Sequence, residues 1–181
     1  MKDEEYMVSY DLLVIGMGAA FQVLDAALDR GLRCAVAERA HYGGTCLNYG
    51  CIPSKVIITV ADTIRHLERA AKTGLKTAKP EVDFAVLKAR VLEKTSENLD
   101  IREEYRAETN LTMYEDVCFV GKKTVAARFA DGSTGEPFTA KTIVIGAGGH
   151  ITIPSVEGIG DVDFMTPVHF FKDRFPDGPL D

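Results

Sequence analysis

The stretch from Tyr10 to Arg39 constrains the fold more than any other part of the sequence. "YDLLVIG" (Tyr10–Gly16) is a short apolar run without polar alternation, which is typical of a strand buried on both faces. The residues that follow keep apolar positions at helical spacing, and Gly31 stands where a glycine commonly ends a helix. "RCAVAER" (Arg33–Arg39) has the pattern of a second buried strand. This strand–helix–strand order predicts a βαβ unit in a parallel sheet.

The turn after the first strand carries part of a dinucleotide-binding pattern. Gly16 and Gly18 match the first two glycines of G-x-G-x-x-G, which permit a tight turn and a close approach to a pyrophosphate at a helix N-terminus. Glu38 lies 20 residues beyond Gly18, where a carboxylate can accept hydrogen bonds from a ribose diol. Phe21 stands in place of the third glycine, and Ala20 serves instead only if the loop is one residue shorter. A plain α/β turn is the alternative interpretation.

The remaining sequence predicts two helices and several strands. A helical pattern lies between Thr45 and about Lys72, and its apolar face is formed by Ile57, Val60, Ala61, Ile64 and Leu67. A second long, amphipathic helix is predicted from Phe84 to about Thr109. "VCFVG" and "TVAARFA", followed by a turn at "DGSTGE", predict a small antiparallel excursion. "KTIVIGAGG" (Lys141–Gly149) returns to the buried-strand pattern. We therefore expect an α/β, Rossmann-like domain over residues 1–150 and an extended connector over residues 151–181.

Charge and hydropathy limit the possible partners and location. The formal net charge of −6 over 181 residues argues against binding to nucleic acid. No apolar run approaches the ~18–20 residues that a membrane helix needs. The acidic start "MKDEEYMVSY" lacks an apolar signal core, so we expect a cytoplasmic protein. In a reducing compartment a disulfide is more often catalytic than structural.

Two of the four cysteines, Cys46 and Cys51, stand close together in "GGTCLNYGCIPSK". A metal site would need two further soft ligands, and the remaining cysteines, Cys34 and Cys118, lie in apolar strand patterns. No metal is therefore expected. An inert cysteine pair is one alternative, and a redox couple is the other.

The residues around the pair favour the redox interpretation. Gly50 and Pro53 are predicted to distort the start of a helix and to hold both sulfurs near its N-terminal end. The helix dipole at that end stabilises a thiolate, and Lys55 adds positive charge nearby.

The segment from Glu38 to Lys55, "ERAHYGGTCLNYGCIPSK", resembles the signature of the flavin-dependent disulfide reductases. This family includes dihydrolipoamide dehydrogenase, glutathione reductase and mercuric reductase. The resemblance is strong over residues 10–60 and looser over the rest of the chain. It implies a Rossmann-like FAD-binding domain that is incomplete relative to the family, whose members are much longer and carry additional NAD(P)-binding and dimerisation domains.

The resemblance implies roles for individual residues. Cys51 would lie nearest the isoalloxazine ring as a charge-transfer thiolate, Cys46 would be the outer thiol that attacks the substrate, and Lys55 would lie near flavin N5. The full set of implied cofactor-binding residues is Gly16 and Gly18 at the pyrophosphate, Glu38 at the ribose, Arg39 at the adenine end, Gly44, Thr45, Cys46, Cys51 and Lys55 on the flavin side, and Gly148 where the first part of the FAD domain closes.

The function implied by the resemblance is FAD-dependent disulfide oxidoreduction with a disulfide or dithiol substrate. In the full-length family NAD or NADP exchanges hydride with the flavin, and the enzyme is a homodimer. We expect this chain to be an N-terminal fragment or a truncated relative that is inactive alone. A non-catalytic Rossmann-like remnant and a flavin-free thiol–disulfide module are the alternatives.

Overall fold

The computed structural model describes residues 7–76, 78–96, 100–172, 175 and 178. These residues form two compact units. The first unit lies within residues 1–44 and 99–149, and the second lies within residues 45–98 and 150–181. The two units are described separately below. The assignment of a FAD-binding domain to residues 1–150 stays a prediction.

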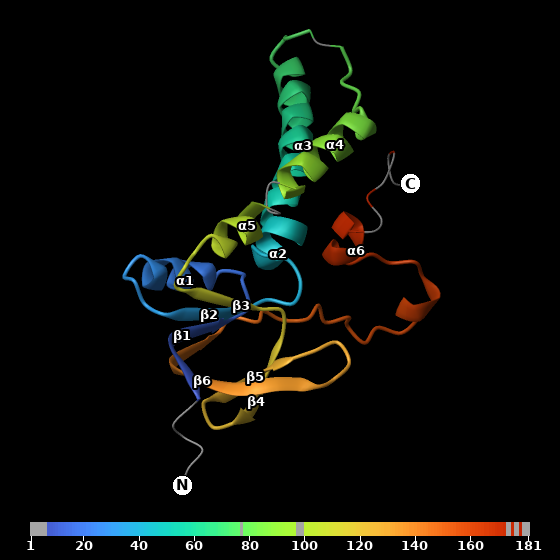
Figure 1. Cartoon of the computed structure of the whole chain (residues 1–181). Coiled ribbons are helices and arrows are strands. Elements are labelled where there is room, and N and C mark those ends of the chain that lie inside the picture. The colour runs from blue at the N-terminus through green and yellow to red at the C-terminus, as the bar shows by residue number, and fades with distance from the viewer. Residues whose placement is uncertain (1–6, 77, 97–99, 173–174, 176–177, 179–181) are drawn as a thin grey trace. The chain divides into compact units, whose positions relative to one another are not determined.

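The first unit is built on a six-stranded sheet with the order β3-β2-β1-β6-β5-β4 (Figure 1). The strands are β1 (Val8–Ile15), β2 (Cys34–Ala37), β3 (Leu111–Tyr114), β4 (Val117–Gly121), β5 (Thr124–Arg128) and β6 (Thr134–Ile145). β1 pairs in parallel with both β2 and β6, and β2 pairs in parallel with β3. β5 pairs antiparallel with both β4 and β6. This mixed α/β architecture confirms the predicted Rossmann-like sheet with a small antiparallel excursion.

The strand register brings the ends of the parallel strands to one edge. Ile15 of β1 pairs with both Ala37 of β2 and Ile145 of β6, and Ala37 pairs with Tyr114 of β3. The residues that follow these strands therefore emerge along the same edge of the sheet. In open parallel sheets this carboxyl edge is where ligands bind.

The centre of the sheet, in β1 and β2, is buried on both faces, as the unbroken apolar pattern of β1 predicts. One core cluster contains Leu12 and Val14, and the cluster on the opposite face contains Leu13. This follows from the alternation of side chains along a strand. The helices α1 (Phe21–Leu28) and α5 (Asp100–Arg106) pack against the first cluster.

A tyrosine ties α5 to α1. The Tyr105 hydroxyl on α5 donates a hydrogen bond to Asp25 Oδ1 on α1 at 2.5 Å. Burial, followed by this bond to the carboxylate, raises the pKa of Tyr105, so the hydroxyl keeps its proton at neutral pH.

Two strands differ from the sequence-based expectation. β3 was not predicted, because "LTMY" is only four residues long and its burial comes from pairing with β2. β6 is a single strand of 12 residues that begins at Thr134, inside the segment predicted as a turn, and ends at Ile145 rather than Gly149. Its residues from Thr134 to Thr139 pair with β5, and those from Phe138 to Ile145 pair with β1.

The second unit is mainly helical. Its helices are α2 (Gly44–Tyr49, of which Gly44 belongs to the first unit), α3 (Cys51–Ala71), α4 (Phe84–Ser96), a 3₁₀ turn at Ile159–Asp161 and α6 (Pro167–Lys172). α3 and α4 contact each other (Figure 1). The predicted apolar face of α3 is only partly buried: Ile57, Val60, Ile64 and Leu67 are half-buried, and Ala61 is exposed.

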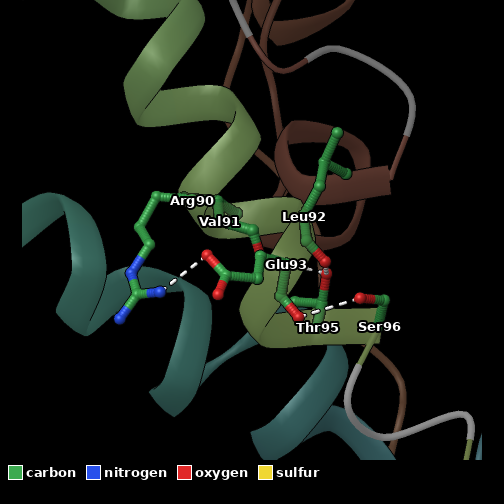
Figure 2. Close-up of polar contacts among 6 residues, drawn as sticks. All are labelled: Arg90, Val91, Leu92, Glu93, Thr95 and Ser96. Carbon is green, nitrogen blue, oxygen red and sulfur yellow. Dashed lines mark hydrogen bonds and ion pairs between the residues drawn. The ribbon is translucent and has the colours of Figure 1, made fainter.

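The helix predicted from Phe84 to about Thr109 is described as two helices, α4 and α5, which belong to different units. Residues 97–99 lie outside the described part. Figure 2 shows the last turns of α4, where Ser96 Oγ donates to the Glu93 carbonyl at 2.8 Å and Thr95 Oγ1 donates to the Val91 carbonyl at 3.1 Å. Hydroxyls that bond to backbone carbonyls in this way weaken the preference for continued helix, a signal that the periodicity analysis overlooked.

Candidate functional site

The turn after β1 requires glycine at its first position. Gly16 has a φ of +94°, and its N–H donates to the Ala37 carbonyl at 2.8 Å. A Cβ atom on Gly16 would lie 2.3 Å from the Gly146 carbonyl oxygen. Because backbone atoms approach so closely here, no side chain fits at Gly16.

Ala20, the residue before Phe21, lies against the segment that follows β6. A Cβ on Gly146 would lie 2.6 Å from the Ala20 Cβ, so the turn and the segment after β6 meet through two small residues. Phe21 begins α1 and packs against the core cluster on that face of the sheet. Ala20 is the N-cap residue and has no side-chain capping bond. The helix thus begins at Phe21, with small residues allowing close packing just before it.

A second glycine segment contacts the same turn. Gly43 N–H donates to the Met17 carbonyl at 2.8 Å. Gly44 has a φ of +58°, and a Cβ there would lie 2.7 Å from Gly18 Cα. A Cβ on Gly18 itself would meet nothing within 4 Å. Gly18 and Gly44, both predicted as cofactor-binding residues, are therefore backbone neighbours, and the space beside Gly18 is open.

Glu38 holds the turn in place. Its Oε2 accepts a hydrogen bond from Met17 N–H, and its Oε1 accepts one from Ala40 N–H, both at 2.8 Å. A carboxylate offers about four acceptor positions, so two remain for other donors such as a ribose diol. The sequence predicted that Glu38 binds ribose hydroxyls but gave no sign that it fixes the turn. Arg39, the next residue, is exposed.

The segment after β6 completes the edge of the sheet. Gly146 N–H donates to the Ile15 carbonyl at 2.7 Å, which extends the β1–β6 pairing by one bond. Gly148 has a φ of +72° with open space around its Cβ position. Gly146 was overlooked as a site residue, although the run "GAGG" is the signal that would have marked it. These residues together fit the backbone approach and carboxylate that a dinucleotide requires.

The thiol pair lies in the second unit, at a break between two helices. Cys46 is on α2 and Cys51 is the first residue of α3, with Gly50 between the helices as the N-cap residue of α3. Both cysteines are exposed free thiols in this structure. Pro53 is buried in the first turn of α3, where proline is tolerated in a helix.

The two cysteine side chains interact. Cys51 raises the pKa of the Cys46 thiol, because a hydrogen bond between the two side chains favours the proton on Cys46. The Cys51 backbone N–H and the Lys55 charge act in the opposite direction and are smaller influences. For Cys46, the neighbouring cysteine therefore acts against the thiolate that Lys55 and the Cys51 N–H favour.

The other cysteines are placed differently. Cys34 is buried in β2, and burial raises the pKa of its thiol. Cys118 is half-buried in β4. Neither shares the exposed position of the pair at the start of α3. Thr45, another predicted site residue, is exposed in α2 beside Cys46.

Comparison with protein families gives one decisive match. The family model described as pyridine nucleotide-disulphide oxidoreductase matches residues 10–175. The chain belongs to this family. The match includes the glycine turn, Glu38, the thiol pair and the strand β6.

Individual members of the family are similar to this chain. A mercuric reductase from Staphylococcus aureus is 31% identical over 163 residues, which are 87% of this chain and 28% of that protein. A mycothione reductase from Mycobacterium tuberculosis is 30% identical over 162 residues, which are 88% of this chain and 35% of that protein. A dihydrolipoyl dehydrogenase from Thermus scotoductus is 44% identical over 84 residues, 46% of this chain and 18% of that protein.

This member of the oxidoreductase family thus spans about a third or less of the length of these relatives. Among its described residues, no helix is both long and apolar enough to cross a membrane. No group of three or more His, Cys, Asp or Glu side chains among them is arranged to hold a metal ion.

Proposed function

We propose that this chain supplies the FAD-binding segment and the redox-active cysteine pair of an FAD-dependent disulfide oxidoreductase. The observation that carries the proposal is the contact between Cys46 and Cys51 at the start of α3. A pair of exposed, interacting thiols can interconvert with a disulfide without large rearrangement. Family membership and the glycine turn support the same conclusion.

The residues of the first unit would hold the nucleotide end of the cofactor. The open space beside Gly18 lets a pyrophosphate approach the backbone, and Glu38 keeps acceptor positions for ribose hydroxyls while it fixes Met17 N–H. Arg39 would lie beside the adenine end, and Gly44, Thr45 and Gly148 would line the rest of the cofactor. When bound, FAD supplies the two-electron chemistry, and the protein supplies binding and orientation.

The thiol pair would exchange with a disulfide substrate in two balanced steps. The Cys46 thiolate attacks one substrate sulfur, forms a mixed disulfide and releases the other substrate sulfur as a thiolate that takes up a proton. The Cys51 thiolate then attacks Cys46 Sγ, forms the Cys46–Cys51 disulfide and releases the second substrate thiol. Run in reverse, these steps oxidise a dithiol substrate.

The proton on Cys46 influences the first step. Because Cys51 raises the pKa of Cys46, the attacking thiolate becomes more abundant as the pH rises above neutrality. Lys55 favours this thiolate by its charge and would also lie near the flavin. For the whole enzyme, we propose NAD or NADP as the hydride partner and a homodimer as the assembly.

The test combines cofactor binding with thiol counting. Purified chain is titrated with FAD and followed by flavin fluorescence, with Gly18→Val as the variant that fills the open space. In parallel, thiols are counted by mass spectrometry before and after treatment with glutathione disulfide. We expect saturable FAD binding that the variant weakens, and one disulfide that joins Cys46 to Cys51 while Cys34 and Cys118 stay free. Four free thiols after oxidation would contradict the redox proposal.

A flavin-free thiol–disulfide module is the second candidate. Both cysteines and Gly50 belong to the helical unit, and thiol–disulfide exchange with a substrate disulfide uses no flavin. A chain that forms the disulfide but does not bind added FAD would support this candidate over the first.

A further inference from the structure

The spacing of the two cysteines is incompatible with a continuous helix. In an α-helix, residues five apart are rotated by about 140° and shifted by about 7.5 Å, which places their Cα atoms roughly 8–9 Å apart. A disulfide needs Cα atoms within about 7 Å. Cys46 and Cys51 both lie in helices, yet their side chains interact. The interruption between α2 and α3 is therefore what brings the sulfurs together.

Gly50 forms that interruption. Its φ of −132° and ψ of −105° are far from helical values, and it separates Tyr49, the end of α2, from Cys51, the start of α3. The backbone folds back tightly at this point. A Cβ atom on Gly50 would lie 3.0 Å from the Thr45 carbonyl oxygen and 3.4 Å from Cys46 Cα.

We propose that Gly50 is a positioning residue that sets the dithiol–disulfide equilibrium of Cys46 and Cys51. Any side chain at this position pushes directly against the backbone that carries Cys46. Alanine has a second effect, since it favours helix over glycine by about 1 kcal/mol and so promotes the joining of α2 and α3. Both effects separate the sulfurs. The inference rests on the proposed function, because it assumes that the pair cycles between dithiol and disulfide.

The experiment measures this equilibrium in the full chain. Wild type and Gly50→Ala are equilibrated with glutathione and glutathione disulfide at a series of ratios, and the fraction of linked Cys46–Cys51 is read by mass spectrometry. Each oxidation converts two thiols and one glutathione disulfide into one protein disulfide and two glutathione molecules. Gly160→Ala is the matched control, because Gly160 is in the same unit and a Cβ there meets nothing within 4 Å.

We expect Gly50→Ala to lower the equilibrium constant for disulfide formation at least tenfold, which corresponds to a reduction potential about 30 mV higher. Gly160→Ala should match wild type. A purely structural role for Gly50 would lower the stability of the helical unit and leave the potential unchanged. If folded Gly50→Ala has the wild-type potential, the positioning role is overturned while the proposed redox function stands.

A second measurement does not depend on the folding of the variant. Backbone chemical shifts of the reduced wild-type chain should be helical on either side of Gly50 and non-helical at Gly50. Helical shifts that continue through Gly50 would overturn the inference. Failure of the wild type to form the disulfide at any glutathione ratio would instead overturn the proposed redox function, and this inference with it.

Discussion

The glycine turn and the thiol pair are held in place by different kinds of contact. In the first unit, Gly16 and Gly44 contact backbone atoms from distant parts of the sequence, and β2 and the centre of β1 are buried. In the second unit, both cysteines are exposed, and Pro53 is the one buried residue among the 21 of α3, all of which are described. The turn is held by tertiary packing, whereas the thiol pair is held by the local course of the backbone at Gly50.

This difference is consistent with the two roles proposed above. A nucleotide-binding turn needs a fixed backbone, because its amide groups must be in place before the ligand arrives. A redox pair must instead be accessible to its substrate and able to change between two covalent states. Substitutions in the first unit should therefore change stability most, and those at the thiol pair should change reactivity most.

The largest effect is expected for Gly16→Ala. The new Cβ would collide with the Gly146 carbonyl, and the positive φ is unfavourable for alanine, so we expect a loss of about 2–6 kcal/mol in the free energy of unfolding. Urea denaturation followed by circular dichroism measures this loss. Gly149→Ala, in the same unit with open space at its Cβ, is the control and should stay close to wild type. Equal stability of the two variants would refute the tight packing of the turn.

The next largest effect on stability is expected for a core substitution in the sheet, and it allows the cores of the two units to be compared. Leu13→Ala removes a fully buried side chain of the sheet and should lower the free energy of unfolding by about 2–5 kcal/mol. Leu92→Ala removes a side chain of α4 that is 53% exposed and should change it by less than about 1 kcal/mol. The same denaturation experiment compares them. Similar losses for both would show that the helical unit has a core as well formed as that of the sheet.

A smaller effect is expected for Glu38→Gln. The glutamine amide nitrogen cannot accept a hydrogen bond, so either Met17 N–H or Ala40 N–H loses its partner, which should lower stability by about 1–2 kcal/mol. Hydrogen exchange of these two amides should become faster, and FAD affinity should fall. The exposed Glu136 provides the matched variant, Glu136→Gln, which should leave exchange at both amides unchanged. Unchanged exchange in Glu38→Gln would mean that Glu38 does not hold the turn.

The smallest effect on the fold, but a clear one on reactivity, is expected for Cys51→Ala. Cys51 raises the pKa of Cys46, so its removal should lower that pKa and increase the thiolate fraction at pH 7.5. Alkylation of Cys46 in the reduced protein should become several-fold faster, and its pH profile should shift to lower pH. The rate at Cys118 is the internal control. A slower or unchanged rate at Cys46 would show that Cys51 does not hold the proton on Cys46.

The local elements of the fold were predictable because their patterns are complete within short stretches. The apolar run of β1 and the start of α3 between Gly50 and Pro53 agree with the sequence-based expectation. β3 was missed, because four half-buried residues become a strand only by pairing with β2. The full length of β6 was missed for the same reason, since its two parts are defined by different neighbours.

The sequence by itself determined the residue types at both sites: glycines in the turn, a carboxylate after β2, and two cysteines around a glycine. Only the tertiary structure decided which of these residues meet. The pairing of Ile15 with Ile145 places Gly146 against Gly16 and Ala20. Contacts of this kind depend on strand register between segments more than 100 residues apart. The physical reason is that side-chain patterns specify local conformation and burial, whereas register is fixed only when the whole sheet packs.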